Sequence, residues 1–236
     1  MSKMKKIFIA CLLIFYGVMG YAQNEKFYEQ ISTPIDESKF VDSTTAKNVY
    51  TFFKTSGLFK WHDYNNCEDR ANAISILLDA WQMPNYKAWV FSGQFLTKDN
   101  GLLTNRYGVR WKYHVAVCLP VKVDGQLKFI TIDPSTTEDA VDVAFWANNV
   151  TDKKNSYYFL TPSNKYIWGG KGKNISQHSF FDRNKTNYEY TIQGLAGFNG
   201  LNKKDRIKMK TTSGRNKLMQ TETSFNNMKN NKPSFN

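Results

Sequence analysis

Residues 109–133 read VRWKYHVAVCLPVKVDGQLKFITID, and this stretch decides the fold. Two β-rich runs flank Asp124-Gly125, and a two-residue Asp-Gly link between such runs is the strongest short-range signal for a β-hairpin. Pairing across a two-residue turn sets His114 opposite Ser135 and makes Asp133 its diagonal neighbour on the same face, within roughly 7–8 Å at the backbone. The stretch therefore predicts an antiparallel hairpin that brings an imidazole and a carboxylate within hydrogen-bonding reach.

The sequence before the hairpin has helical periodicity. Apolar residues recur at helical spacing between Ser43 and Gly57, and again between Asn66 and Pro84, where they form one stripe. Counting back by four from Ala71 on that stripe gives Cys67. We therefore expect the cysteine in the first turn of the second helix, on the face that packs inward.

Short segments around the hairpin complete the pattern. The sequence predicts a short helix over 140–148 and strands over 87–91, 157–160 and 166–168. A helix that carries a cysteine, followed by an antiparallel sheet, indicates the α+β class. A chain of 236 residues has room for one sizeable domain, which we place at residues 44–190 and expect to be a monomer.

The N-terminal segment has the pattern of a secretory signal. Three lysines in the first six residues precede an apolar run from Ile7 to Met19, and Gly20-Tyr21-Ala22 supplies small residues for cleavage. The apolar run is shorter than the roughly 20 residues needed to span a bilayer. We therefore expect a signal peptide over 1–22, no stable membrane anchor, and export (periplasmic or secreted) after cleavage near Ala22-Gln23. Residues 23–43 are predicted to form a short linker or pro-like segment.

The positive charge is concentrated at the two ends of the chain. The formal net charge of +12 by itself suggests a nucleic-acid partner. Residues 23–200, however, carry a net charge of only +2, whereas residues 201–236 carry +7, so we expect no specific nucleic-acid partner. Large apolar groups are scattered in residues 191–236, which predicts a basic, disordered tail. Such a tail either attracts anionic surfaces and acidic substrate proteins or is a passive solubilising extension.

Two cysteines remain after the expected cleavage, Cys67 and Cys118. A disulfide between them is possible; otherwise at least one is a free thiol in an oxidising compartment. Cys118 lies four residues beyond His114 on the same face of its strand, and we interpret it as a core residue. Cys67 differs because the positive end of a helix dipole stabilises a thiolate at a helix N-terminus.

A reactive cysteine needs a base, and the chain has three histidines, His62, His114 and His178. The hairpin geometry favours His114, because Asp133 can fix its tautomer and stabilise the imidazolium. Each of these residues also has a structural interpretation: a buried cysteine, a strand histidine and a turn aspartate. Their order along the chain is the one that papain-like and transglutaminase-like thiol enzymes use.

Five collinear segments, which cover about 110 residues, carry a family resemblance. They are FKWHDYNNCEDRANAI (59–74), VRWKYHVAVCL (109–119), FITIDPS (129–135), VAFWANN (143–149) and YYFLTPSNKYIW (157–168). In these segments the chain resembles the protein glutaminases, secreted bacterial protein-glutamine deamidases built on a papain/transglutaminase-like core. The resemblance implies Cys67 as nucleophile, His114 as general base and acid, and Asp133 as the orienting carboxylate.

The resemblance also implies the reaction. The side-chain amide of a protein-bound glutamine would be hydrolysed to glutamate and ammonia through a thioester, so the substrates would be proteins or peptides with an accessible glutamine. The same triad serves transglutaminases and cysteine proteases, because the sequence does not distinguish water from an amine as the acyl acceptor. A noncatalytic secreted binding module that retains the fold is a further alternative.

Residues near the expected site are candidates for contacting the substrate. Asn65 or Asn66 could donate to the oxyanion of a tetrahedral intermediate or cap the helix. Trp61, Trp111 and Tyr113 could wall the cleft or belong to the core. The sequence contains neither C-x-x-C nor H-E-x-x-H, so we expect no metal and no cofactor.

Overall fold

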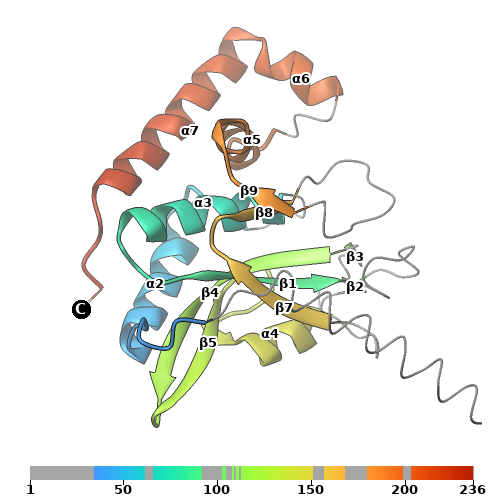
Figure 1. Ribbon diagram of the computed structural model, residues 1–236. Helices are drawn as coiled ribbons and strands as arrows, with labels where there is room; N and C mark the ends of the chain where they lie inside the picture. Colours follow the sequence, from blue (N-terminus) through green and yellow to red (C-terminus); the bar gives the residue numbers. More distant parts are fainter. Residues whose placement is uncertain are drawn as a thin grey trace, which may run out of the picture.

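The centre of the molecule is a five-stranded antiparallel sheet with the strand order β6-β5-β4-β1-β7 (Figure 1). The computed structural model describes residues 35–61, 66–91, 103–104, 108, 110–111, 113–150, 157–167, 180–198 and 203–235. The five strands are β1 (Tyr86–Phe91), β4 (Tyr113–Val123), β5 (Gln126–Ile132), β6 (Val141–Asp142) and β7 (Tyr157–Pro162). Two smaller antiparallel pairs are β2 (Leu103–Thr104) with β3 (Arg110–Trp111), and β8 (Lys165–Ile167) with β9 (Phe180–Asp182).

Helices pack on both faces of the sheet. The helices α2 (Ser43–Thr55) and α3 (Cys67–Ala80) cover one face, and α4 (Val143–Val150) covers the other (Figure 1). Three more helices follow β9, namely α5 (Lys185–Leu195), α6 (Lys203–Met209) and α7 (Thr212–Asn230). The α+β class, with the cysteine-bearing helix packed on an antiparallel sheet, is confirmed. No helix within the described residues is long and apolar enough to cross a membrane.

The β4–β5 hairpin has the predicted register. Val123 pairs with Gln126 next to the turn, and the pairing continues without a bulge past Pro120 to Val117 opposite Ile132. Asp124 and Gly125 both have positive φ, 51° and 77°, as a two-residue type I′ turn requires. The two-residue Asp-Gly turn therefore fixes which residues of β4 and β5 lie side by side.

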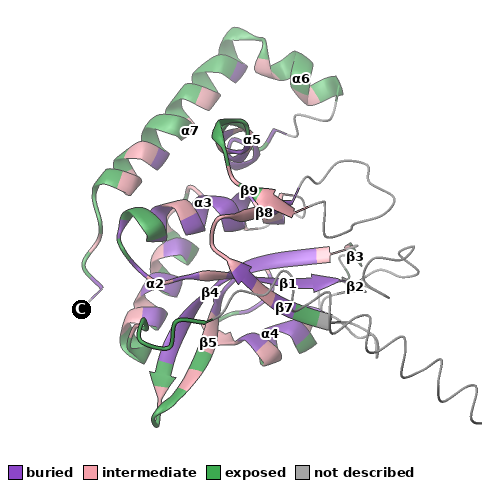
Figure 2. Ribbon diagram, viewed as in Figure 1, coloured by how far each residue is buried: buried purple, intermediate pink, exposed green. Residues whose placement is uncertain are grey.

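Strand alternation divides the core into two layers, seen as buried residues on both sides of the sheet (Figure 2). Val115, Val117 and Leu119 of β4 belong to the layer shared with α2 and α3. Ala116 and Cys118 belong to the layer shared with α4. Cys118 is fully buried there, which agrees with its interpretation as a core residue, and both Cys67 and Cys118 are free thiols.

The predicted disordered tail over 191–236 is wrong for the described residues. α5 runs through the expected domain boundary at 190, and α7 is a helix of 19 residues. The large apolar residues of α7 are few, but Leu218, Phe225 and Met228 recur at intervals of seven and three and therefore lie on one helical face. Phe225 on this face is fully buried against the domain core.

Contacts with the domain hold the end of the chain in place. The Trp81 indole Nε1 donates to the backbone carbonyl of Met228 at 3.2 Å, and Lys232 Nζ donates to the Trp81 carbonyl at 3.1 Å. Phe235 packs its ring against Phe52 and Trp81, with centroids 5.8 Å away in both cases. The basic C-terminal segment is thus part of the folded unit. Several of its apolar side chains pack on the domain, and most of its charged side chains point to solvent.

Candidate active site

Cys67 is the first residue of α3 and is buried. The preceding Asn66 turns the chain into the helix with a left-handed backbone, φ 71°, a conformation that asparagine tolerates better than most residues. Asn66 occupies the N-cap position, but its side chain makes no capping hydrogen bond, so the capping alternative for this side chain is not observed. The left-handed turn, rather than a side-chain cap, sets where the cysteine enters the helix.

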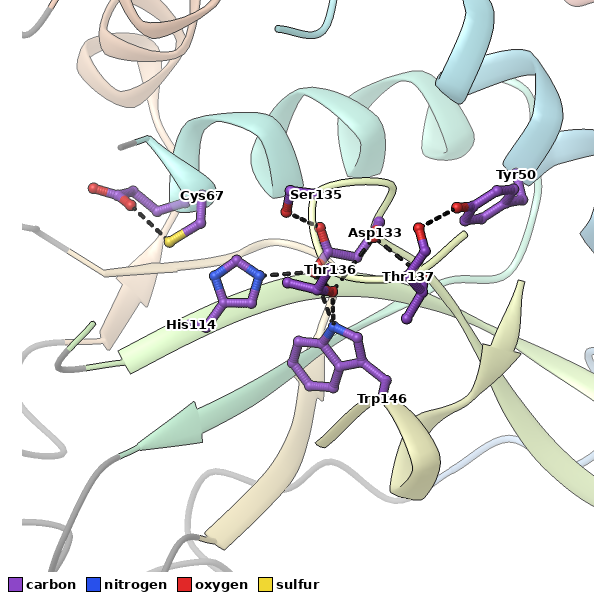
Figure 3. A network of polar contacts seen from close by, with 9 residues as sticks. Tyr50, Cys67, His114, Asp133, Ser135, Thr136, Thr137 and Trp146 are labelled. Atoms are coloured by element: carbon purple, nitrogen blue, oxygen red, sulfur yellow. Dashed lines mark hydrogen bonds and ion pairs between the residues drawn. The ribbon is translucent and has the colours of Figure 1, made fainter. Parts of the chain in front are cut away.

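His114 and Asp133 form the predicted contact. His114 Nε2 lies 2.7 Å from Asp133 Oδ2, and both side chains are almost completely buried. The hairpin register produces this contact, because Asp133 directly follows β5 and His114 lies near the start of β4. The other ring nitrogen, Nδ1, is buried and has no hydrogen-bond partner among the described residues. In Figure 3 this nitrogen points toward Cys67.

Asp133 is held by more donors than His114 alone. Its carboxylate accepts hydrogen bonds from the hydroxyls of Ser135 and Thr136, and Trp146 Nε1 donates to Oδ2 at 2.9 Å (Figure 3). Burial alone would raise the pKa of Asp133, but the charge and hydrogen bond of His114, with the two hydroxyls, hold that pKa below its usual range. The carboxylate is therefore ionised and fixed in orientation beside the imidazole.

The Asp133 loop is itself anchored to the surrounding helices. The backbone N–H groups of Thr136 and Thr137 donate to the Asp133 carbonyl, at 3.0 and 3.1 Å. The Tyr50 hydroxyl of α2 donates to the Thr137 carbonyl at 2.8 Å (Figure 3). Burial is the main cause that raises the pKa of Tyr50 to about 12. Sequence reasoning missed both Tyr50 and Trp146, although Trp146 lies within one of the five segments that carry the resemblance.

Two of the predicted aromatic residues lie beside the site. Trp111 stacks on His114, with ring centroids 4.4 Å apart and an interplanar angle of 18°. Trp61 lines a small cavity together with Cys67, Arg70 and Asp133, and its ring lies 5.7 Å from the Arg70 guanidinium carbon. These contacts allow Trp111 to restrict the imidazole ring and place Trp61 at the cavity wall.

Tyr113, the third predicted aromatic, has a different environment. Its ring stacks on Phe91 at 5.5 Å and packs against the main core. Burial is the main cause that raises the pKa of Tyr113, and the charges of Glu68 and Cys67 raise it further. Tyr113 is therefore a core residue whose hydroxyl lies within electrostatic range of the site.

The surroundings of Cys67 disfavour the thiolate form of its side chain. Its Sγ donates to Glu68 Oε2 at 3.3 Å. Burial raises the pKa of Cys67 well above its usual value, and the adjacent Glu68 carboxylate raises it further. Arg70 and the backbone N–H of Val115 act in the opposite direction but do not compensate. Thiolate formation therefore requires a nearby base to accept the proton.

The site contains three of the predicted residues, Cys67, His114 and Asp133. A buried thiol, an imidazole with one bare nitrogen and a fixed carboxylate are the groups that nucleophilic acyl transfer needs. Asn65, His62 and His178 lie outside the described residues. Within the described part of the chain, no group of three or more His, Cys, Asp or Glu side chains is placed to hold a metal ion.

Solved protein-glutaminase structures share this fold. A crystal structure of protein-glutaminase aligns with a TM-score of 0.50 and 20% identity, over 67% of this chain and 87% of that chain. The NMR structure of protein-glutaminase from Chryseobacterium proteolyticum aligns with a TM-score of 0.49 and 20% identity, over 67% and 90% of the two chains. A crystal structure of a pro-protein-glutaminase mutant aligns with a TM-score of 0.50 and 18% identity, over 72% and 66%. No curated protein matches the sequence.

The shared fold and the glutaminase family match together indicate a hydrolase that acts on amides. Residues 35–150 match the model of a family described as glutaminase, and this segment contains Cys67, His114 and Asp133. In this segment, which is just under half of the chain, the protein is similar to the glutaminase family.

Proposed function

We propose that this protein is an exported protein-glutamine deamidase in which Cys67 is the nucleophile, His114 the general base and acid, and Asp133 the orienting carboxylate. The observation that carries the proposal is the 2.7 Å contact between His114 Nε2 and Asp133 Oδ2. It leaves Nδ1, which has no hydrogen-bond partner among the described residues, directed toward Cys67 (Figure 3). A histidine paired on one nitrogen with a carboxylate is oriented to accept a proton on the other.

In the proposed reaction, His114 Nδ1 takes the proton of the Cys67 thiol. The resulting thiolate attacks the side-chain carbonyl carbon of a glutamine, and the tetrahedral intermediate collapses to a thioester. Ammonia leaves with the proton that the imidazolium returns. His114 then draws a proton from water, whose oxygen attacks the thioester to release the glutamate side chain and the Cys67 thiol.

The tetrahedral oxyanion needs donors that are already in position. The backbone N–H of Cys67 lies at the N-terminus of α3, where amide groups have no partner within the helix and the helix dipole is positive. We assign the oxyanion site to this helix end, with Asn65 and Asn66 as the side chains nearest to it in sequence.

The N-terminal segment extends the proposal to the location of the protein. Lysines, an apolar run and small residues before Gln23 support cleavage near Ala22 and export. N-terminal sequencing of the protein recovered from the culture medium or periplasm of the expressing cell tests this part. A mature N-terminus near Gln23 is expected, and an intact Met1 in the cytoplasm contradicts export.

The activity is tested with an unfolded casein-like protein as substrate. The wild type should release ammonia and increase the substrate mass by about 1 Da for each converted glutamine, because an amide becomes an acid. Cys67→Ser and His114→Ala should each remove nearly all turnover, whereas Asp133→Asn should leave a weak remnant. Cys118→Ser, which changes the other buried thiol, is the matched control and should remain active.

Other products would identify the competing functions. Backbone cleavage would indicate a protease, and crosslinked substrate a transglutaminase. A substrate that the wild type leaves unchanged would indicate a noncatalytic binding module and contradict the proposal.

A further inference from the structure

Glu68 lies directly beside the proposed nucleophile. Its Oε2 accepts the hydrogen bond from Cys67 Sγ at 3.3 Å, and its side chain is only partly buried. Cys67 itself is buried. Glu68 therefore places a partly exposed carboxylate in direct contact with the sulfur of Cys67.

The neighbouring residues of α3 have other contacts. Asp69 turns inward, where it accepts a hydrogen bond from the Tyr166 hydroxyl at 2.8 Å. It packs so closely on α5 that a Cβ added at Gly194 would clash with its carboxylate. Arg70 donates to the Lys60 carbonyl at 3.4 Å and is buried. Glu68 is therefore the charged residue of this turn that remains partly accessible to a bound substrate.

A fixed negative charge at this point affects both the thiol and the substrate. The carboxylate opposes formation of a second negative charge on the sulfur. After burial, its field also raises the pKa of Tyr113, and after burial and the charge of Asp69 it raises the pKa of Tyr166. A cationic side chain next to the bound glutamine would be attracted and would offset this repulsion. An acidic side chain in the same place would add to it.

Resting on the function proposed above, we propose that Glu68 is a specificity-determining residue that selects glutamines flanked by lysine or arginine and disfavours glutamines flanked by aspartate or glutamate. Two charges within several ångströms at a protein surface interact by about 1 kcal/mol, which is roughly a fivefold effect on kcat/KM for each sign of charge. The structure therefore predicts discrimination by charge, in addition to any discrimination by shape.

The first experiment compares two peptides that differ only at the residue next to glutamine, lysine in one and glutamate in the other. The wild type should have a kcat/KM about 25-fold higher for the lysine peptide, because the roughly fivefold gain with lysine and the roughly fivefold loss with glutamate multiply. Glu68→Gln should reduce this ratio at least threefold, and Glu68→Asp, which keeps the charge, should preserve most of it. The matched control Glu189→Gln removes a carboxylate from an exposed position on α5 and should leave the ratio unchanged. A ratio that Glu68→Gln does not alter would overturn the proposal.

The second experiment does not depend on turnover. Cationic and anionic methanethiosulfonate reagents are compared at one pH, with modification located on Cys67 by peptide mass mapping. The wild type should react faster with the cationic reagent, and Glu68→Gln should reduce that preference several-fold. If no peptide is deamidated, the proposed function fails. The ratio of the cationic to the anionic modification rate then decides by itself whether Glu68 selects by charge at the site. Equal ratios in wild type and Glu68→Gln would overturn that selection.

Discussion

The indole of Trp146 and the imidazole of His114 bind the same carboxylate oxygen of Asp133, at 2.9 and 2.7 Å respectively. Trp146 comes from α4 on the opposite face of the sheet from the Cys67 helix, so the carboxylate is fixed from a separate layer of the fold. Trp146 Nε1 also lies 3.1 Å from Thr136 Oγ1. Trp146 is thus a positioning residue for the proposed triad.

Trp146→Phe should lower kcat about tenfold with little change in KM, since one hydrogen bond that orients Asp133 is lost, at about 1.4 kcal/mol. The measurement is steady-state deamidation of a glutamine peptide. Trp89→Phe is the matched control, because it also removes a buried indole hydrogen bond, that to Thr161 at 2.8 Å. An equal loss of kcat in both variants would assign the effect to general destabilisation.

Tyr50→Phe should destabilise the fold by about 1 kcal/mol, because it removes the hydrogen bond to the Thr137 carbonyl. The folded-state pKa of Tyr50 is raised to about 12, above the value near 10 for an unfolded tyrosine. The stability advantage of the wild type over the variant should therefore be complete below pH 10 and decline as pH rises toward 12. Urea unfolding at several pH values measures it, and a difference that grows above pH 10 would contradict the assignment.

Lys87 is a buried amine that donates to Asn72 Oδ1 at 3.1 Å and to the Lys165 carbonyl at 2.6 Å. Burial is the main cause that lowers its pKa well below the usual value, so the unfolded state binds more protons than the folded state up to about pH 10.4. The stability of the wild type relative to Lys87→Met should consequently increase with pH across the alkaline range.

Unfolding of both proteins by urea between pH 6 and pH 9.5 checks this expectation for Lys87. Lys128→Met, at an exposed position on β5, is the control and should show no such pH dependence. A constant difference between the wild type and Lys87→Met over the whole range would show that the amine keeps an ordinary pKa.

Phe225→Ala should destabilise the protein by about 3–5 kcal/mol, because the phenyl ring is fully buried and packs on Tyr188 with centroids 5.9 Å apart. Met219→Ala changes an apolar residue of the same helix that is 62% exposed and should alter stability by no more than about 0.5 kcal/mol. Thermal unfolding compares the two. Equal melting temperatures for Phe225→Ala and the wild type would show that α7 does not pack on the domain through Phe225.

Local sequence signals predicted the elements that carry the proposed triad. The Asp-Gly turn specified the register of β4 and β5, and the apolar stripe that includes Ala71 placed Cys67 at the start of α3. The contact of Trp146 with Asp133 depends on how α4 packs against the sheet, which no short-range pattern specifies. The sequence analysis did not predict α7, because the large apolar residues of this segment are few. Their spacing, which places them on one helical face, indicates the helix.

The side chain of Asn48 in the first described helix donates to the backbone carbonyl of Phe235, 187 positions further along the chain. Contacts between residues so distant in sequence form late in folding, because the entropy of closing the intervening loop opposes them. During synthesis, the aromatic cluster around Phe52 and Trp81 therefore stays incomplete until Phe235 has emerged from the ribosome. The order in which the ribosome delivers these residues thus delays closure of the core until synthesis has passed Phe235.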